Sequence, residues 1–143
     1  MAKSKPAALS LLGRSEARLP ASPDEAQLET FPSPAKRPYT VRFDTSDFTS
    51  LCPVTGQMDF AHIVIEYVPA DLCVESKSLK FYLASFRNQC AFNEAVTNRI
   101  LDDLVAACSP RSAVVTAEFS ARGGIALTVR AEYSASASKR NGR

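Results

Sequence analysis

Residues 60–68 have the sequence Phe-Ala-His-Ile-Val-Ile-Glu-Tyr-Val, and Pro69-Ala70-Asp71 follows directly. β-Branched and aromatic side chains dominate this run, which is typical of a β-strand. Proline and aspartate are turn residues, so the strand should end at residue 68. One further strand is recognisable before this run, and two helices and two strands are recognisable after it.

On the N-terminal side, residues 39–43 alternate enough to predict a first strand, and the polar residues from 44 to 58 predict a loop. On the C-terminal side, apolar residues recur twice at the spacing of a helix face. The first set is Leu79, Leu83, Phe86 and Cys90, and the second set runs from Val96 to Cys108. Two helices are therefore predicted after the strand at 60–68.

Two more strands are predicted at residues 114–119 and 125–131, on either side of a glycine-bearing hairpin loop. This order predicts an α+β fold, a four-stranded antiparallel sheet with two helices on one face. The other face and both sheet edges would need protection, so we expect a ring-like homo-oligomer. The predicted boundaries are a flexible N-terminal arm over residues 1–34, a folded domain over 35–133 and a flexible basic tail over 134–143.

Bulk composition narrows the class of protein. The chain has 143 residues, 45% of them hydrophobic, which suits one globular domain. A formal net charge of +2 is too small to indicate a nucleic-acid-binding surface. No apolar run approaches the ~20 residues of a membrane span, and no secretory signal is recognisable, so a cytoplasmic location is expected. The four cysteines form no C-x-x-C pair, so free thiols are expected and a structural zinc site is not.

Cys52 and Asp59 are the first candidates for chemistry. Both lie in a turn-rich segment that leads into the strand at 60–68. An activated thiol can attack a carbon atom, and a protonated carboxyl group can donate to a developing negative charge. The alternatives, an idle loop thiol and a solvated turn aspartate, stay open on spacing alone.

The starts of the two helices carry further candidates. Glu75, Lys77 and Lys80 open the first helix, where a helix N-terminus and lysines would attract phosphate, although a solvated helix start is the alternative. Arg122 could be another phosphate contact or an ordinary exposed hairpin arginine. Glu94 opens the second helix and could accept two parallel N–H bonds from a guanine-like edge. The alternative is a first-turn glutamate that the helix dipole stabilises.

Together these segments resemble the 7-cyano-7-deazaguanine reductases, the NADPH-dependent nitrile reductases of queuosine biosynthesis. Residues 48–60, Phe-Thr-Ser-Leu-Cys-Pro-Val-Thr-Gly-Gln-Met-Asp-Phe, resemble the active-site segment of that family. Residues 74–80, Val-Glu-Ser-Lys-Ser-Leu-Lys, resemble its signature for NADPH binding. Residues 85–88, 92–94 and 122–125 follow at the expected places. The resemblance covers about residues 39 to 130 and implies the tunnelling fold, in the short single-module branch related to GTP cyclohydrolase I.

Carried over by position, the resemblance implies a role for each candidate. Cys52 would be the nucleophile that forms a thioimidate, and Asp59 would be the proton donor. The implied substrate-binding residues are Val74, Glu75, Ser76, Asn93 and Glu94. The implied contacts to the cofactor phosphates are Lys77, Lys80 and Arg122. The family often has His-Glu where this chain has Asn93-Glu94, and an asparagine can donate and accept hydrogen bonds but cannot carry the charge of an imidazole.

The implied reaction is NADPH-dependent reduction of the nitrile of 7-cyano-7-deazaguanine to 7-aminomethyl-7-deazaguanine. The resemblance also implies NADPH as the cofactor, no metal, a homo-oligomer of pentamer rings stacked as a decamer, and no direct contact with nucleic acid or membrane. Two kinds of alternative stay open. One is an amidine-forming transferase or a cyclohydrolase-like enzyme on the same fold, and the other is a non-catalytic purine- or pterin-binding module.

Overall fold

The structure of the protein, a computed structural model, describes residues 18–136. Strands, two α-helices and one 3₁₀-helix follow one another along this range. Their bounds, in chain order, are β1 Thr30–Pro32, β2 Val41–Leu51, β3 Met58–Val68, β4 Leu72–Val74, α1 Ser76–Ala84, η1 Ser85–Asn88, α2 Asn93–Cys108, β5 Ser112–Arg122 and β6 Ile125–Ser134. No helix in residues 18–136 is both long enough and apolar enough to span a membrane.

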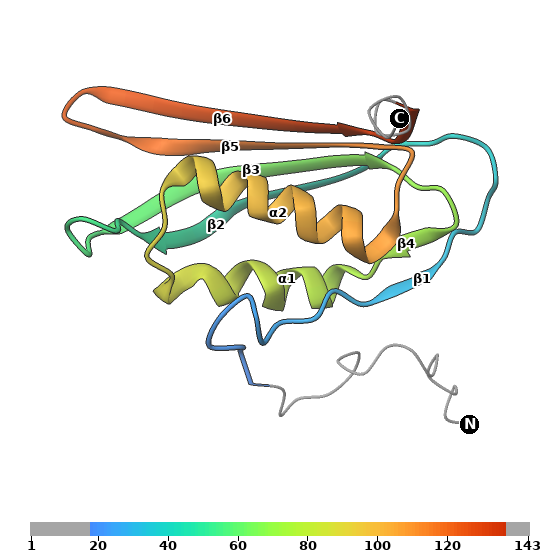
Figure 1. Cartoon of the computed structure of the whole chain (residues 1–143), viewed down its shortest axis with the longest axis horizontal. Helices are drawn as coiled ribbons and strands as arrows, with labels where there is room; N and C mark the ends of the chain where they lie inside the picture. The colour runs from blue at the N-terminus through green and yellow to red at the C-terminus, as the bar shows by residue number, and fades with distance from the viewer. Residues whose placement is uncertain (1–17, 137–143) are drawn as a thin grey trace, which may run out of the picture.

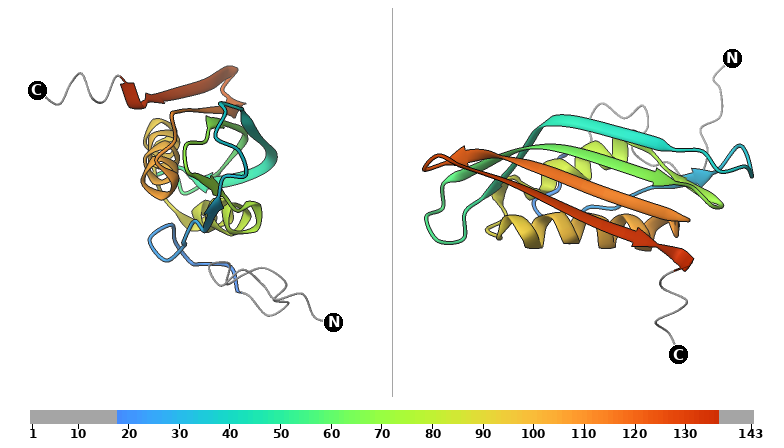
Figure 2. Two further views of the ribbon diagram at one scale, coloured as in Figure 1. Left: turned by 90° about the vertical axis from the view of Figure 1, so that its right-hand side faces the viewer. Right: turned by 90° about the horizontal axis from the view of Figure 1, so that it is seen from above.

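One antiparallel sheet, with strand order β2-β3-β5-β6, forms the main layer of the molecule. Both helices lie on the same face of this sheet (Figures 1 and 2). The predicted α+β class, with a four-stranded antiparallel sheet and two helices, is therefore confirmed. The structure adds a second sheet, in which β1 pairs with β4.

The core lies between the sheet and the helices. Alternate residues of β3, Ile63, Ile65 and Tyr67, are at most 1% exposed, and Ile100 and Leu104 of α2 are equally buried. Every second side chain of a strand faces the same way, so the β-branched run predicted from the sequence supplies one continuous apolar face. Removing such side chains from water is the main term that stabilises the fold.

β2 is longer than predicted and replaces much of the expected loop at residues 44–58. It pairs with β3 as far as Leu51 opposite Met58, with a shift of register between Thr45 and Phe48. The polar side chains of this segment suggested a loop, but most of them are exposed or half-buried on an edge strand, while Phe48 and Ser50 are buried. The bulge lets the strand continue past these polar residues, and only residues 52–57 connect β2 to β3.

The N-terminal segment also differs from the prediction in its described part. Besides the β1–β4 pairing, the Pro20 carbonyl accepts a hydrogen bond from Arg87 at 2.7 Å, and the Glu29 carbonyl accepts one from the Glu75 backbone at 2.8 Å. The predicted arm over residues 1–34 is therefore tied to the domain from residue 20 onward, and residues 1–17 lie outside the described part. At the other end, β6 reaches the predicted boundary at residue 134, and residues 137–143 of the expected basic tail are likewise outside it.

The first predicted helix is divided in the structure. α1 ends at Ala84, and the 3₁₀-helix η1 continues to Asn88. Leu79, Leu83 and Phe86 are buried as predicted, but Cys90 lies beyond the helix and is exposed, so its expected place in the core is wrong. The apolar spacing holds only as far as the helical backbone continues.

Substitution of Phe48 tests whether β2 continues beyond the bulge. Phe48 is 3% exposed, and its ring centroid lies 5.7 Å from that of Phe86. We expect Phe48→Ala to lower the free energy of unfolding by about 3–5 kcal/mol, measured by denaturant unfolding, because the truncation leaves a cavity between sheet and helix. The control Val54→Ala, at a side chain that is 79% exposed, should change it little. A loss for Phe48→Ala as small as that of the control would mean that residues 44–58 are a loop.

Candidate active site

One end of the sheet brings together five of the predicted site residues. The β2–β3 connection, the β5–β6 hairpin and the start of α2 all lie at the left-hand end of Figure 1. Leu51 fixes this arrangement, because its N–H donates to Gln89 at 2.9 Å and its carbonyl accepts from Ala91 at 3.2 Å. The five residues at this end are Cys52, Asp59, Asn93, Glu94 and Arg122.

Cys52 opens the tight connection between β2 and β3. Its backbone N–H donates to the Gln57 carbonyl at 2.8 Å, and its carbonyl accepts from Gly56 at 2.9 Å. Gly56 has φ 69°, a conformation that favours glycine. The thiol is partly exposed. Hydrogen bonds from the Thr55 hydroxyl and from the backbone of Thr55 and Val54 lower the pKa of Cys52, while desolvation and the charge of Asp59 act in the opposite direction.

Asp59 is buried rather than solvated. It is 8% exposed and lies directly opposite Ser50 in the β2–β3 ladder. Arg122 Nη2 lies 2.8 Å from Asp59 Oδ1, and the same guanidinium group donates to the Met58 carbonyl. The alternative of a solvated turn aspartate is therefore wrong. Arg122, which the resemblance assigned to the cofactor, is ion-paired with the candidate proton donor in this structure.

The start of α2 presents an acidic and an aromatic side chain. Phe92 is the N-cap residue and is 63% exposed, while Asn93 is the first helical residue rather than the cap. Glu94 is exposed in the first turn. Among the described residues, the Asn93 side-chain oxygen is buried and has no hydrogen-bond partner. An acceptor in this state is available for a donor group of a ligand.

Four of the remaining predicted site residues lie at the opposite end of the molecule, and Lys80 lies between the two ends. Val74, Glu75, Ser76 and Lys77 surround the start of α1, and Lys80 follows on the same helix. α1 has nine residues and η1 has four, so together they separate this end from the segment at 89–91 by roughly 20 Å. One copy of the chain therefore does not bring the two groups of predicted residues into one site.

Glu75 has a structural role at this second end. Its carboxylate is 7% exposed and accepts hydrogen bonds from the backbone N–H groups of Lys77 at 2.8 Å and Ser78 at 2.7 Å, which makes it the N-cap of α1. The neighbouring Val74 is buried, and its N–H donates to the Tyr67 hydroxyl at 2.9 Å. Ser76 and Lys80 are exposed.

Two pockets adjoin this second group, and no sequence motif predicts them. The larger, of about 370 Å³, is lined by Val74, Glu75 and Ser76 together with aromatic rings from distant segments. The other, of about 360 Å³, lies between α1 and the β2 bulge and includes Ser76 and Lys80. The aromatic residues of the first pocket are Phe31, Tyr39, Phe43 and Tyr67. Their side chains are scattered over the sequence, so only the fold reveals the cluster.

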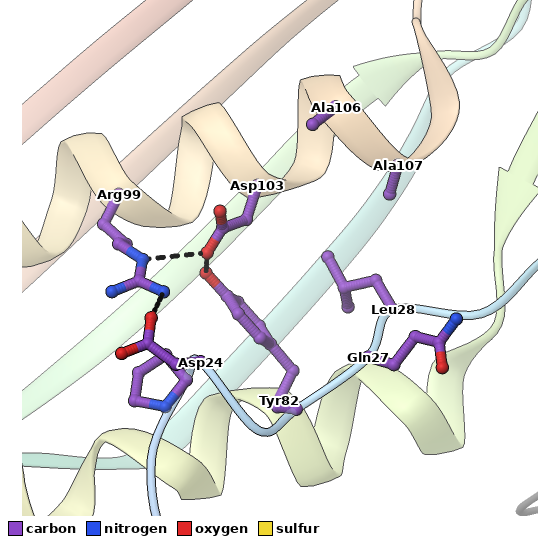
Figure 3. Close-up of a pocket in the computed structure, with 10 residues that line it drawn as sticks. Asp24, Gln27, Leu28, Tyr82, Arg99, Asp103, Ala106 and Ala107 are labelled. Carbon is purple, nitrogen blue, oxygen red and sulfur yellow. Dashed lines mark hydrogen bonds and ion pairs between the residues drawn. The ribbon is translucent and has the colours of Figure 1, made fainter.

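A further pocket, of about 420 Å³, lies beneath the N-terminal segment and contains none of the predicted site residues. Figure 3 shows Asp24, Arg99, Asp103 and Tyr82 joined in one chain of polar contacts there. Arg99 lies 2.6 Å from Asp24 and 3.2 Å from Asp103, which also accepts from the Tyr82 hydroxyl at 2.5 Å. These groups satisfy one another and tie the N-terminal segment to α2.

Among residues 18–136, no three His, Cys, Asp or Glu side chains lie together in a way that could hold a metal ion. That the protein needs no metal is still a prediction. His62, the single histidine of the chain, lies on the open face of the sheet between Asp44 and Glu118.

Comparison with known proteins identifies the family of this chain. A family model described as QueF-like protein matches residues 58–138, more than half of the chain. The chain belongs to the QueF-like protein family. Several curated relatives carry the name NADPH-dependent 7-cyano-7-deazaguanine reductase, and two examples follow. The relative from Nitrosococcus oceani is 57% identical over 116 residues, which are 80% of this chain and 89% of the relative. The relative from Alkalilimnicola ehrlichii is 58% identical over 107 residues, 74% of this chain and 83% of the relative.

A solved structure in the same family supports the fold. The apo crystal structure of the archaeosine synthase QueF-Like matches with a TM-score of 0.63 and 28% sequence identity. The match covers 68% of this chain and 95% of that protein. The expected resemblance to the nitrile reductases is therefore confirmed at the level of the family, and the fold is shared with a QueF-like protein that bears a different name.

The hydroxyl group of Thr55 should control the reactivity of Cys52. We expect Thr55→Val to slow alkylation of Cys52 by iodoacetamide at pH 7 about three- to tenfold, because loss of this hydrogen bond raises the pKa of Cys52 and lowers the thiolate fraction. Labelling should be followed by mass spectrometry in a Cys90→Ala background, since Cys90 is also exposed.

Thr55→Ser keeps the hydroxyl and should label at the unmodified rate. Equal rates for Thr55→Val and Thr55→Ser across pH would contradict the role of the Thr55 hydroxyl.

Proposed function

We propose that this protein is an NADPH-dependent reductase that converts the nitrile of 7-cyano-7-deazaguanine to 7-aminomethyl-7-deazaguanine, in the pathway to queuosine in tRNA. The observation that carries the proposal is the identity of 52–58% over most of the chain to relatives with this name. The neighbourhood of a thiol and a buried carboxyl group supports it, because reduction of a nitrile needs both an activating nucleophile and a proton donor.

Cys52 activates the nitrile by covalent attack. Its sulfur forms a bond to the nitrile carbon, one C–N π bond breaks, and the nitrogen takes a proton from Asp59 to give a thioimidate. When bound, NADPH supplies hydride, and two equivalents are needed to reach the amine. Between the two reductions the C–S bond breaks, and Cys52 leaves as thiolate with an imine as the other product. The lowered pKa of Cys52 favours both its attack and its departure.

Recognition of the deazaguanine ring is assigned to the start of α2. The exposed Glu94 carboxylate suits the two parallel N–H groups of an aminopyrimidinone edge. The exposed ring of Phe92 can cover the face of the heterocycle. The buried Asn93 oxygen can accept a further N–H, which keeps a hydrogen-bonding role where the family often has histidine.

The cofactor is assigned to the cationic side chains. Lys80 is exposed beside the pocket between α1 and the β2 bulge, and Lys77 lies in the first turn of the same helix, whose N–H groups at Lys77 and Ser78 are already bound by Glu75. The two lysines suit phosphate groups, with an adjoining apolar surface for a ring. Arg122 would complete the set only when its ion pair with Asp59 opens, because a carboxyl group that donates a proton cannot also be the anionic half of that pair.

A homo-oligomer would complete the site. The residues of the first group and those around the start of α1 lie at opposite ends of one chain, so a second copy is needed to bring them together. β2 and β6 are the outer strands of the main sheet, and their free edges can pair between copies into a ring. We assign pentamer rings stacked as a decamer, in the cytoplasm, with neighbouring copies closing the pocket against water so that the imine is not hydrolysed.

A transferase that forms an amidine from the same nitrile is the second candidate. The similarity of the fold to the archaeosine synthase QueF-Like favours it. The sequence run Glu75-Ser76-Lys77-Ser78-Leu79-Lys80 favours the reductase, since a transferase has no need of a cofactor with phosphate groups.

Consumption of NADPH tests the proposal. The purified protein should oxidise two NADPH per molecule of 7-cyano-7-deazaguanine, and Cys52→Ala should lose both this activity and the covalent adduct seen by mass spectrometry. Cys90→Ala, a matched cysteine variant at an exposed position, should keep both.

A substrate adduct on Cys52 without NADPH oxidation would assign the protein to the transferases. Full activity of Cys52→Ala would exclude the covalent mechanism.

A further inference from the structure

Ser50 is a buried polar residue at the candidate active site to which no role has been given. It lies in β2 two residues before Cys52 and directly opposite Asp59 in β3. Its side chain is 0% exposed. Among the described residues, its hydroxyl oxygen has no hydrogen-bond partner.

An unpartnered buried hydroxyl group lowers the stability of a fold. Two other fully buried serines of this chain avoid that cost. Ser78 donates to the Glu75 carbonyl at 2.8 Å, and Ser85 donates to the Tyr82 carbonyl. An alanine would fill the same space at residue 50 without a polar group to satisfy. The hydroxyl of Ser50 is therefore best explained by a partner that it acquires during function.

The strand geometry indicates Asp59 as this partner. Residues directly opposite one another in an antiparallel pair have Cβ atoms about 4.5–5.5 Å apart, so a short side-chain rotation brings the Ser50 oxygen within reach of the Asp59 carboxyl group. Cys52 follows directly after β2, two residues beyond Ser50, so it lies at the same end of the sheet. Asp59 instead pairs with Arg122 at 2.8 Å in this structure.

We propose that Ser50 is a positioning residue that donates a hydrogen bond to Asp59 while Asp59 protonates the nitrile nitrogen. This inference rests on the proposed reductase function. During the step, the S–C bond forms, a C–N π bond breaks and the Asp59 proton moves to nitrogen, which leaves Asp59 as a buried carboxylate. The Ser50 proton stays on its own oxygen and stabilises that new charge.

Ser50→Ala separates this role from a structural one, because the two predict opposite changes. We expect the rate of adduct formation in a single turnover, and kcat, to fall about 10- to 100-fold, with KM changed less than about twofold. The thermal unfolding temperature should stay the same or rise, since a buried unsatisfied group is removed. The control Ser85→Ala should unfold at a lower temperature and keep its kcat, because it loses a satisfied hydrogen bond away from the site.

A double-mutant cycle tests whether Ser50 acts through Asp59. Ser50→Ala should not slow adduct formation further in an Asp59→Asn background, because the proton donor that it serves is already absent. An equal slowing in both backgrounds, or unchanged kcat in Ser50→Ala, would overturn the inference and leave the reductase function standing. Failure of the unmodified protein to oxidise NADPH with the nitrile would instead overturn the function on which the inference rests.

Discussion

The pairing of β2 with β3 beyond the bulge is the contact on which the candidate active site depends. It continues to Leu51 opposite Met58, so that residues 52–57 close a short loop with Cys52 at its first position. The same register sets Ser50 against Asp59 on the face of the sheet that carries the core. The proposed nucleophile, the proposed proton donor and the buried hydroxyl are thus positioned by backbone hydrogen bonds between β2 and β3 and within the short connection.

The sequence was sufficient to predict the secondary-structure elements whose pattern is local. The run at 60–68, the two apolar helix faces and the glycine-bearing hairpin each predict their element without knowledge of the rest of the chain. The prediction of a loop at residues 44–58 was wrong, because outward-facing polar residues on an edge strand such as β2 have the composition of a loop. Sequence patterns also missed β1 and β4, whose three-residue pairing is made between segments about forty residues apart.

For the candidate site as well, local sequence motifs predict one part, and contacts between distant segments determine the rest. Motifs identify Cys52, Asp59, Glu94 and the lysines, but not their positions in space. Only the fold reveals that Lys77 lies at the start of α1, away from Cys52, and that Lys80 lies beside the pocket between α1 and the β2 bulge. The burial of Asp59 and its ion pair with Arg122 depend on the β5–β6 hairpin, which no pattern around Asp59 encodes. If these residues form one site, a second copy must supply part of it, as the proposed homo-oligomer would.

Subunit complementation tests this division most directly. Hybrid oligomers should be assembled from two inactive chains, Cys52→Ala and Lys77→Ala/Lys80→Ala, and assayed for NADPH oxidation with 7-cyano-7-deazaguanine. If each site takes one group of residues from each of two copies, random hybrids should recover about a quarter of the unmodified activity, because some sites combine two intact halves. No recovery in hybrids that contain both chains would show that each site is built within a single chain and would contradict this account.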